Sequence, residues 1–166
     1  MSPSITIIAI VAADGAIGRG GDQPFHIRED FRRFKEATMG KPIVMGRRTF
    51  EALPKGALPG RRNIVLTSDP EWSAPGAERA ATFEDAILMC PDCKEIMVIG
   101  GGTVYRQVMP YADRMLLTRV DATVDDADTF FPEIDPRLWK ITEESAPMTD
   151  PRSGATFRFI TYSLIL

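Results

Sequence analysis

The stretch KEIMVIGGGTVYRQVM, residues 94–109, combines a strand-like run, a turn and a helical pattern in sixteen positions. An apolar run leads into three consecutive glycines and then into a helix start, where bare backbone N–H groups attract anions. Three glycines in a turn are alone a weak signal, and the GxGxxG fingerprint of dinucleotide sites is missing. The stretch predicts one strand–helix unit of an α/β protein with a candidate anion-binding turn.

The same unit recurs along the chain. Apolar runs at residues 4–11, 41–46, 62–68 and 94–100 alternate with helical patterns at residues 28–38, 47–53, 82–90 and 103–109. Alternation of this kind is typical of parallel strands with helices on both faces.

The last third of the chain differs in pattern. Residues 114–124, 138–147 and 155–166 are strand-like with few helical residues between them, which predicts antiparallel strands at one edge. No linker or repeat divides the sequence. We therefore expect one domain over residues 1–166, with a mainly parallel sheet of about eight strands flanked by about four helices.

Composition excludes several classes of protein. The 166 residues are 44% hydrophobic and 26% charged with a net charge of −3, so there is no basic excess for binding nucleic acid. The N-terminal residues 1–15 lack a cationic segment and a long apolar span, so we expect no signal peptide, no membrane partner and a cytoplasmic location. Cys90 and Cys93 have only His26 as a companion, which predicts reduced thiols and no metal site.

Two further strand ends carry anion-binding chemistry. KPIVMGRRTFEAL, residues 41–53, repeats the order of strand, glycine and helix start and adds Arg47 and Arg48, while NIVLTS ends on the hydroxyls of Thr67 and Ser68. Ligands of open α/β sheets bind at the carboxyl ends of the strands. An arginine pair alone is more often a solvated helix face, but the three ends together predict a phosphorylated cofactor such as a dinucleotide.

An acid lies inside an apolar stripe in FHIREDFRRFKEATMG, residues 25–40. Ile27, Phe31 and Phe34 follow helical spacing, and Asp30 falls between them. An ionised carboxylate against apolar surface is unfavourable unless something pairs with it. Asp30 is therefore a candidate functional residue, whereas we interpret His26 as a loop-to-helix residue.

The segments IAIVAADGAIG, PFHIREDFRRFK, KPIVMGRRTFEAL, LPGRRNIVLT and EIMVIGGGTVY resemble, in order and spacing, motifs of bacterial dihydrofolate reductases. The resemblance covers nearly the whole chain, including LLTRVDA and TFFP. It implies the fold of that family and NADPH-dependent reduction of 7,8-dihydrofolate to 5,6,7,8-tetrahydrofolate, which supports one-carbon and thymidylate metabolism. Hydride would pass to pterin C6 and a proton to N5. It also implies antifolate inhibitors as ligands, and we expect a monomer.

The resemblance assigns roles to individual residues. Asp30, the catalytic residue, would lie at the bottom of the folate pocket and accept hydrogen bonds from the pterin N3–H and 2-amino group. Thr118 would join this network, and Arg61 would meet the α-carboxylate of the glutamate tail. The implied apolar walls are Ile8, Ala9, Ile10, Phe31, Phe34, Leu53, Leu58 and Ile99.

The resemblance also implies a set of NADPH contacts. The adenosine phosphates would meet Arg47, Arg48, Thr49, Thr67 and Ser68. Gly100, Gly101 and Gly102 would approach the pyrophosphate, with a cis Gly100–Gly101 bond, and the backbone of Ile10 and Ile17 would hold the nicotinamide amide. The remaining implied contacts are Gly46, Leu66, Thr103, Val104 and Tyr105.

Two other functions remain open at this point. The reductase domain of riboflavin biosynthesis has a similar architecture and acts on a ribosylated pyrimidine, and a nucleotide-sensing module could keep the glycine turns without catalysis. Asp30 and the arginine of LPGRR favour folate over the first alternative. The acid, Thr118 and the complete set of walls argue against the second.

Overall fold

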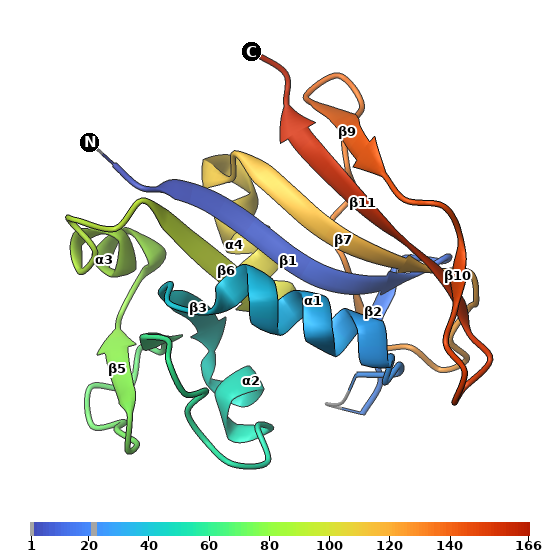
Figure 1. Cartoon of the computed structure of the whole chain (residues 1–166). Helices are drawn as coiled ribbons and strands as arrows, with labels where there is room; N and C mark the ends of the chain where they lie inside the picture. Colours follow the sequence, from blue (N-terminus) through green and yellow to red (C-terminus); the bar gives the residue numbers. More distant parts are fainter. Residues whose placement is uncertain (1, 21–22) are drawn as a thin grey trace.

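The computed structural model describes residues 2–20 and 23–166, and Figure 1 shows their arrangement as a twisted sheet with helices packed against it. The elements, in chain order, are β1 (Ser4–Ala12), β2 (Ala16–Gly18), α1 (Arg28–Thr38), β3 (Ile43–Gly46), α2 (Arg47–Glu51), β4 (Asn63–Leu66), β5 (Ala77–Ala80), α3 (Phe83–Leu88), β6 (Glu95–Gly100), α4 (Gly102–Val108), the 3₁₀ turn η1 (Met109–Tyr111), β7 (Arg114–Val120), β8 (Thr129–Phe130), β9 (Trp139–Glu144), β10 (Met148–Thr149) and β11 (Thr156–Leu164).

The main sheet has nine strands in the order β10-β11-β7-β1-β6-β3-β4-β5, with β9 also paired to β11. All pairs from β7 to β5 are parallel, and β11 is antiparallel to β7, β9 and β10. A mainly parallel sheet with an antiparallel C-terminal edge is confirmed. For residues 114–124 the antiparallel prediction was correct on one side only, because β7 is antiparallel to β11 but parallel to β1. The helix α4 and the turn η1 supply the crossover that a parallel neighbour requires.

The helices agree with the pattern of the sequence. The helix predicted at residues 28–38 is α1, α2 and α3 are shorter than predicted by one or two residues at one or both ends, and α4 has the predicted length but begins one residue earlier. Thr82 is the N-cap of α3, where its side chain accepts a hydrogen bond from the Asp85 N–H, so the helix itself begins one residue later. In the described part of the chain, the helices are too short or too polar to cross a bilayer.

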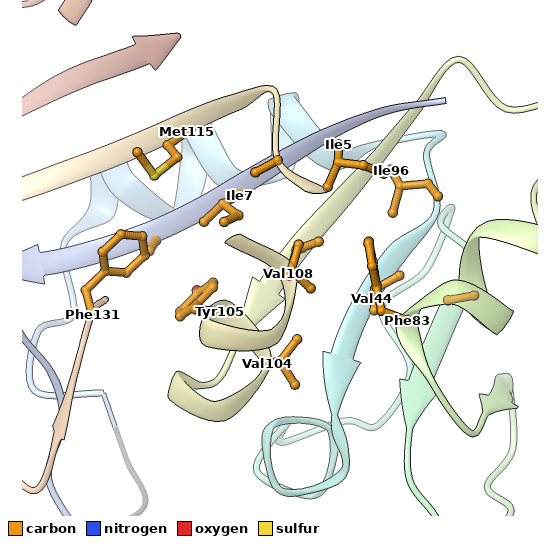
Figure 2. Packing of buried hydrophobic residues seen from close by; sticks show 14 of the residues in the cluster. Ile5, Ile7, Val44, Phe83, Ile96, Val104, Tyr105, Val108, Met115 and Phe131 are labelled. Atoms are coloured by element: carbon orange, nitrogen blue, oxygen red, sulfur yellow. The ribbon is translucent and has the colours of Figure 1, made fainter. Parts of the chain in front are cut away.

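The two faces of the sheet are set by alternation along β1. Ile5, Ile7, Ala9 and Val11 pack into the core cluster that includes Tyr105 of α4, while the intervening residues face α1. Figure 2 shows this cluster, to which α4 contributes Val104, Tyr105 and Val108. A strand buried on both faces is apolar at nearly every position, which explains the unbroken run SITIIAIVA.

Two neighbouring strands separate at the carboxyl edge of the sheet. The pairing of β1 with β6 ends at Ile7 and Val98, whereas the pairing of β1 with β7 continues to Ala12. Among the described residues, the edge of β1 that faces β6 has no strand partner beyond Ile7, and the Tyr105 hydroxyl donates to the Ile8 carbonyl at 2.8 Å. The separation occurs at the edge where ligands of open α/β sheets bind.

Replacing Tyr105 with phenylalanine is expected to lower the free energy of unfolding by about 1–3 kcal/mol, because a buried carbonyl loses its donor. Urea denaturation of both proteins measures the change. Tyr111→Phe is the matched control, since the exposed Tyr111 hydroxyl donates to Glu84 at the surface. Equal stability of Tyr105→Phe and the parent would contradict the assigned role of this hydrogen bond.

Candidate active site

Asp30 and Thr118 meet between the first turn of α1 and the strand β7. The buried Thr118 hydroxyl donates to Asp30 Oδ1 at 2.6 Å, so the structure brings together two residues that are 88 positions apart. The helix α1 begins after Ile27 without a side-chain cap, and its first turn contains Glu29 and Asp30. These acids complement the partial positive charge of the helix N-terminus.

Burial and hydrogen bonding act on Asp30 in opposite directions. Burial raises the pKa of the Asp30 carboxyl above its ordinary value, and the Thr118 hydroxyl and the Arg33 charge offset only part of that effect. Burial also raises the pKa of the Tyr105 hydroxyl, which therefore remains a hydrogen-bond donor at neutral pH. The site therefore combines the Asp30 carboxylate, whose ionised form is disfavoured by burial, with the Tyr105 hydroxyl, which stays protonated and donates to β1.

Asp30→Asn is expected to make the ligand-free protein more stable at neutral pH. A pKa that is higher in the folded than in the unfolded state contributes stability below the unfolded pKa of about 3.9, and that contribution is lost as pH rises through the folded pKa. Asparagine has no charge to desolvate and still accepts from Thr118. Thermal unfolding against pH checks this, and a mutant that is less stable than the parent above the folded pKa would contradict it.

The predicted apolar walls fall mostly on the α1 face of the sheet. Phe34, Leu53, Leu58 and Ile99 pack around Ile8, and Ile10 packs with Ile27 under the start of α1. Phe31 is half exposed, and its ring stacks on His26 with the ring centroids 6.2 Å apart. The Ala9 side chain lies in the core of the opposite face, because it alternates with Ile8 and Ile10, so on the α1 face Ala9 offers only backbone.

Arg61 lies beside the opposite end of α1. Its Nη1 donates to Thr38 Oγ1 at 3.1 Å and its Nε donates to the Pro59 carbonyl at 2.9 Å. The Thr38 hydroxyl in turn donates to the Phe34 carbonyl one helical turn back. Partial burial lowers the pKa of Arg61 from its ordinary high value, but the guanidinium remains charged. The helix therefore has the Asp30 carboxylate at one end and a guanidinium at the other.

Two helix starts share the carboxyl edge of β3 and β6. Gly46 is the N-cap of α2 and Gly101 the N-cap of α4, neither helix has a side-chain cap, and the two strands are paired. A Cβ added at Gly46 would lie 3.2 Å from Val104 Cγ2, and one added at Gly101 would lie 3.4 Å from Thr49 Oγ1. The bare N–H groups and the absence of side chains fit the phosphates of a dinucleotide.

The Gly100–Gly101 peptide is cis, as expected. Two other predicted cofactor residues, Val104 and Tyr105, have side chains buried in the core: the Tyr105 hydroxyl donates to Ile8 of β1, and Val104 lies beside Gly46 at the end of β3. They can therefore offer a ligand only their backbone, and their burial explains the apolar pattern of α4. Thr103, by contrast, is exposed on this helix.

The arginines after β3 lie at the surface. Arg47 forms ion pairs of 3.3 Å with Glu51 and with Asp69, whereas Arg48 has no ion pair within residues 2–20 and 23–166. Thr67 Oγ1 accepts from the Asp69 N–H at 3.2 Å. Leu66 ends β4 half-buried, and Ser68 beyond it is exposed. The three strand ends thus present the cations and hydroxyls that the sequence predicts for this edge.

Sequence reasoning missed Thr129 and Arg33 as neighbours of the site, whereas Ile17 of β2 was already implied by the family resemblance. A Cβ added at Gly102 would lie 2.5 Å from Thr129 Cγ2 and 3.8 Å from Ile17 Cδ1, so the β2–β8 ribbon lies against the third glycine. Neither β2 nor β8 is long enough for an alternation of apolar and polar residues to be visible in the sequence. The second missed residue is Arg33. The sequence pattern puts it on the polar face of α1, but in the structure its guanidinium packs against β7 and β11.

Comparison with known proteins gives one family. The sequence model described as dihydrofolate reductase matches residues 4–164. The chain is 43% identical over 158 residues to dihydrofolate reductase of Neisseria meningitidis serogroup A, covering 95% of this chain and 96% of the relative. It is 42% identical over 159 residues to dihydrofolate reductase type 3 of Salmonella typhimurium, covering 96% and 97%.

A solved structure agrees with these relatives. Dihydrofolate reductase from Enterococcus faecalis, complexed with NADP(H) and RAB-propyl, superposes with a TM-score of 0.88 at 32% identity, covering 97% of this chain and 96% of that one. Sequence and structure match over almost the full length of both. The chain therefore belongs to the dihydrofolate reductase family of NADPH-dependent oxidoreductases.

Proposed function

We propose that the protein reduces 7,8-dihydrofolate to 5,6,7,8-tetrahydrofolate with NADPH and that Asp30 binds the pterin ring and supports its protonation at N5. NADPH supplies the hydride that C6 receives. The observation that carries the proposal is a partly buried carboxylate bonded at 2.6 Å by Thr118, whose partner Ile10 lies in the part of β1 beyond its pairing with β6.

Asp30 has hydrogen-bonding capacity left for a substrate. The Thr118 hydroxyl takes one position on Oδ1, and a carboxylate has about four lone-pair sites on its two oxygens. A pair of parallel N–H donors, such as the pterin N3–H and 2-amino group, matches that geometry with charge-assisted bonds. The negative charge favours the protonated ring, and the proton itself comes from solvent water.

The two ends of α1 suit an elongated substrate. Eight residues separate Asp30 from Thr38, which corresponds to about 12 Å along the helix axis. Arg61, hydrogen-bonded to Thr38, would bind the α-carboxylate of the glutamate tail while Asp30 binds the pterin. The walls of Phe34, Leu53 and Leu58 would cover the part of the molecule between them.

The glycine turns and arginines would hold NADPH on the other side of the β1–β6 separation. Gly100, Gly101 and Gly102 would approach the pyrophosphate, and Arg47, Arg48 and Ser68 would bind the adenosine phosphates. The Ile10 and Ile17 backbones would orient the nicotinamide amide. We also propose that the enzyme works as a monomer in the cytoplasm, and the free thiols of Cys90 and Cys93 support that location.

An assay of NADPH oxidation tests the proposal. We expect the absorbance of NADPH to fall when dihydrofolate is added, with formation of tetrahydrofolate, and an antifolate inhibitor to stop the reaction. Oxidation with a ribosylated pyrimidine but not with dihydrofolate would assign the chain to the alternative reductase. Tight NADPH binding without turnover on either compound would indicate a nucleotide-sensing module.

A further inference from the structure

Arg33 is a cation on the packed side of α1. Its Nη1 donates to the Leu117 carbonyl at 3.3 Å, and its guanidinium carbon lies 4.3 Å from the centroid of the Phe159 ring. The first contact reaches β7 and the second reaches β11, so the head group is fixed at both strands. A guanidinium over an aromatic face is a favourable arrangement that preserves its charge.

The two residues that contact the Arg33 guanidinium, Leu117 and Phe159, are both adjacent to Thr118 in the sheet. Leu117 precedes Thr118 on β7, and Phe159 is its cross-strand partner on β11. Thr118 is the residue that donates to Asp30, and Arg33 follows Asp30 by three positions, on the same side of the helix. The fixed cation and the site carboxylate therefore occupy one region between α1 and the β7–β11 pair.

Arg33 forms no ion pair with any of the residues that the structure describes. Its neighbour Arg32, by contrast, pairs with Glu29 and Glu36 on the exposed face. The charges that act on Arg33 are Asp30 on its own helix, Glu143 on β9 and Arg114 on β7. The groups that act on Asp30 are Thr118 and Arg33, and the charge of Asp30 also acts on Tyr105 of α4.

We propose that Arg33 is a positioning residue for the reaction, whose guanidinium, fixed on Leu117 and Phe159, keeps the Asp30 carboxylate ionised and ready to receive the N–H donors of the substrate. The inference rests on the proposed role of Asp30. Electrostatics supports it, since burial raises the pKa of Asp30 and the charge of Arg33 lowers it. Without that charge, more of the free enzyme would carry a protonated Asp30 that cannot accept two hydrogen bonds from the ring.

The test compares Arg33→Gln with Arg33→Lys, which keeps the charge, and with Arg32→Gln, which removes an equal charge from the exposed face. The first readout is the pKa of Asp30 in the free protein, followed by NMR of its carboxyl carbon. We expect Arg33→Gln to raise that pKa, Arg33→Lys to return it toward the parental value, and Arg32→Gln to leave it unchanged. Arg33→Met, which keeps an unbranched side chain beside the Phe159 ring without the charge, is the second neutral variant if glutamine prevents folding.

The second readout is kcat/KM for dihydrofolate against pH, whose bend should move in the same direction as the pKa of Asp30. A neutral variant that is less stable but keeps the parental pKa of Asp30 would show that Arg33 only joins α1 to the sheet, and would overturn the inference. An equal shift in Arg32→Gln would overturn it as well. Because the NMR measurement needs no substrate, lack of turnover with dihydrofolate would count against the proposed function alone.

Discussion

Asp30→Asn is expected to lower kcat/KM for dihydrofolate at neutral pH by about 10²–10⁴-fold, the range of a positioned acid–base group. Asparagine has one acceptor oxygen, and the Thr118 hydroxyl already takes part of its capacity. The amide also has no negative charge to favour a protonated pterin. Substrate binding and ring protonation both become less favourable, whereas the fold keeps its Thr118 contact.

The activity of the variant should recover in acid. Lower pH protonates more of the substrate before it binds, and this compensates for the missing carboxylate, so the mutant should gain far more activity on acidification than the parent. Profiles of kcat/KM against pH for both proteins provide the measurement. Glu36→Gln is the matched control, because it removes an exposed acid from the same helix and should leave the profile unchanged. A mutant profile parallel to that of the parent would show that Asp30 does not support substrate protonation.

Replacing Arg47 and Arg48 together with alanine should raise KM for NADPH much more than KM for NADH. The two cofactors differ by the 2′-phosphate, and each lost charge-assisted hydrogen bond to phosphate is worth about 1.5–3 kcal/mol, or roughly tenfold to a hundredfold. Arg48 should contribute strongly, because the described residues leave it without an ion pair, whereas Arg47 must exchange Glu51 and Asp69 for the ligand.

Steady-state kinetics with both cofactors measures this preference. The control is the double substitution of Arg137 and Arg158 with alanine, which also removes two positive charges. These arginines form ion pairs with Asp135 and Glu144, respectively, near the antiparallel edge of the sheet. The control should keep the parental ratio of the two KM values. Equal losses for NADPH and NADH in the first variant would exclude Arg47 and Arg48 from contact with the 2′-phosphate.

Local patterns in the sequence determined the elements that matter most for the site. The apolar runs gave strands, the glycines of 100–102 gave a helix start without side chains, and the position of Asp30 in the stripe of α1 indicated a functional acid. These features depend on residues a few positions apart, so backbone geometry alone relates them. The roles of individual residues in dihydrofolate binding came from the family resemblance, since no periodicity identifies a ligand.

Only the tertiary structure decided how distant segments meet. The direction of β7 depends on the crossover through α4, and the separation of β1 from β6 beyond Ile7 depends on which strands continue to pair, so neither is visible in a local window. The placement of Arg33 shows the same limit. Polar residues on an amphipathic helix usually face solvent. Arg33 instead faces the sheet, because its guanidinium contacts the Leu117 carbonyl and the Phe159 ring, which belong to residues more than eighty positions away.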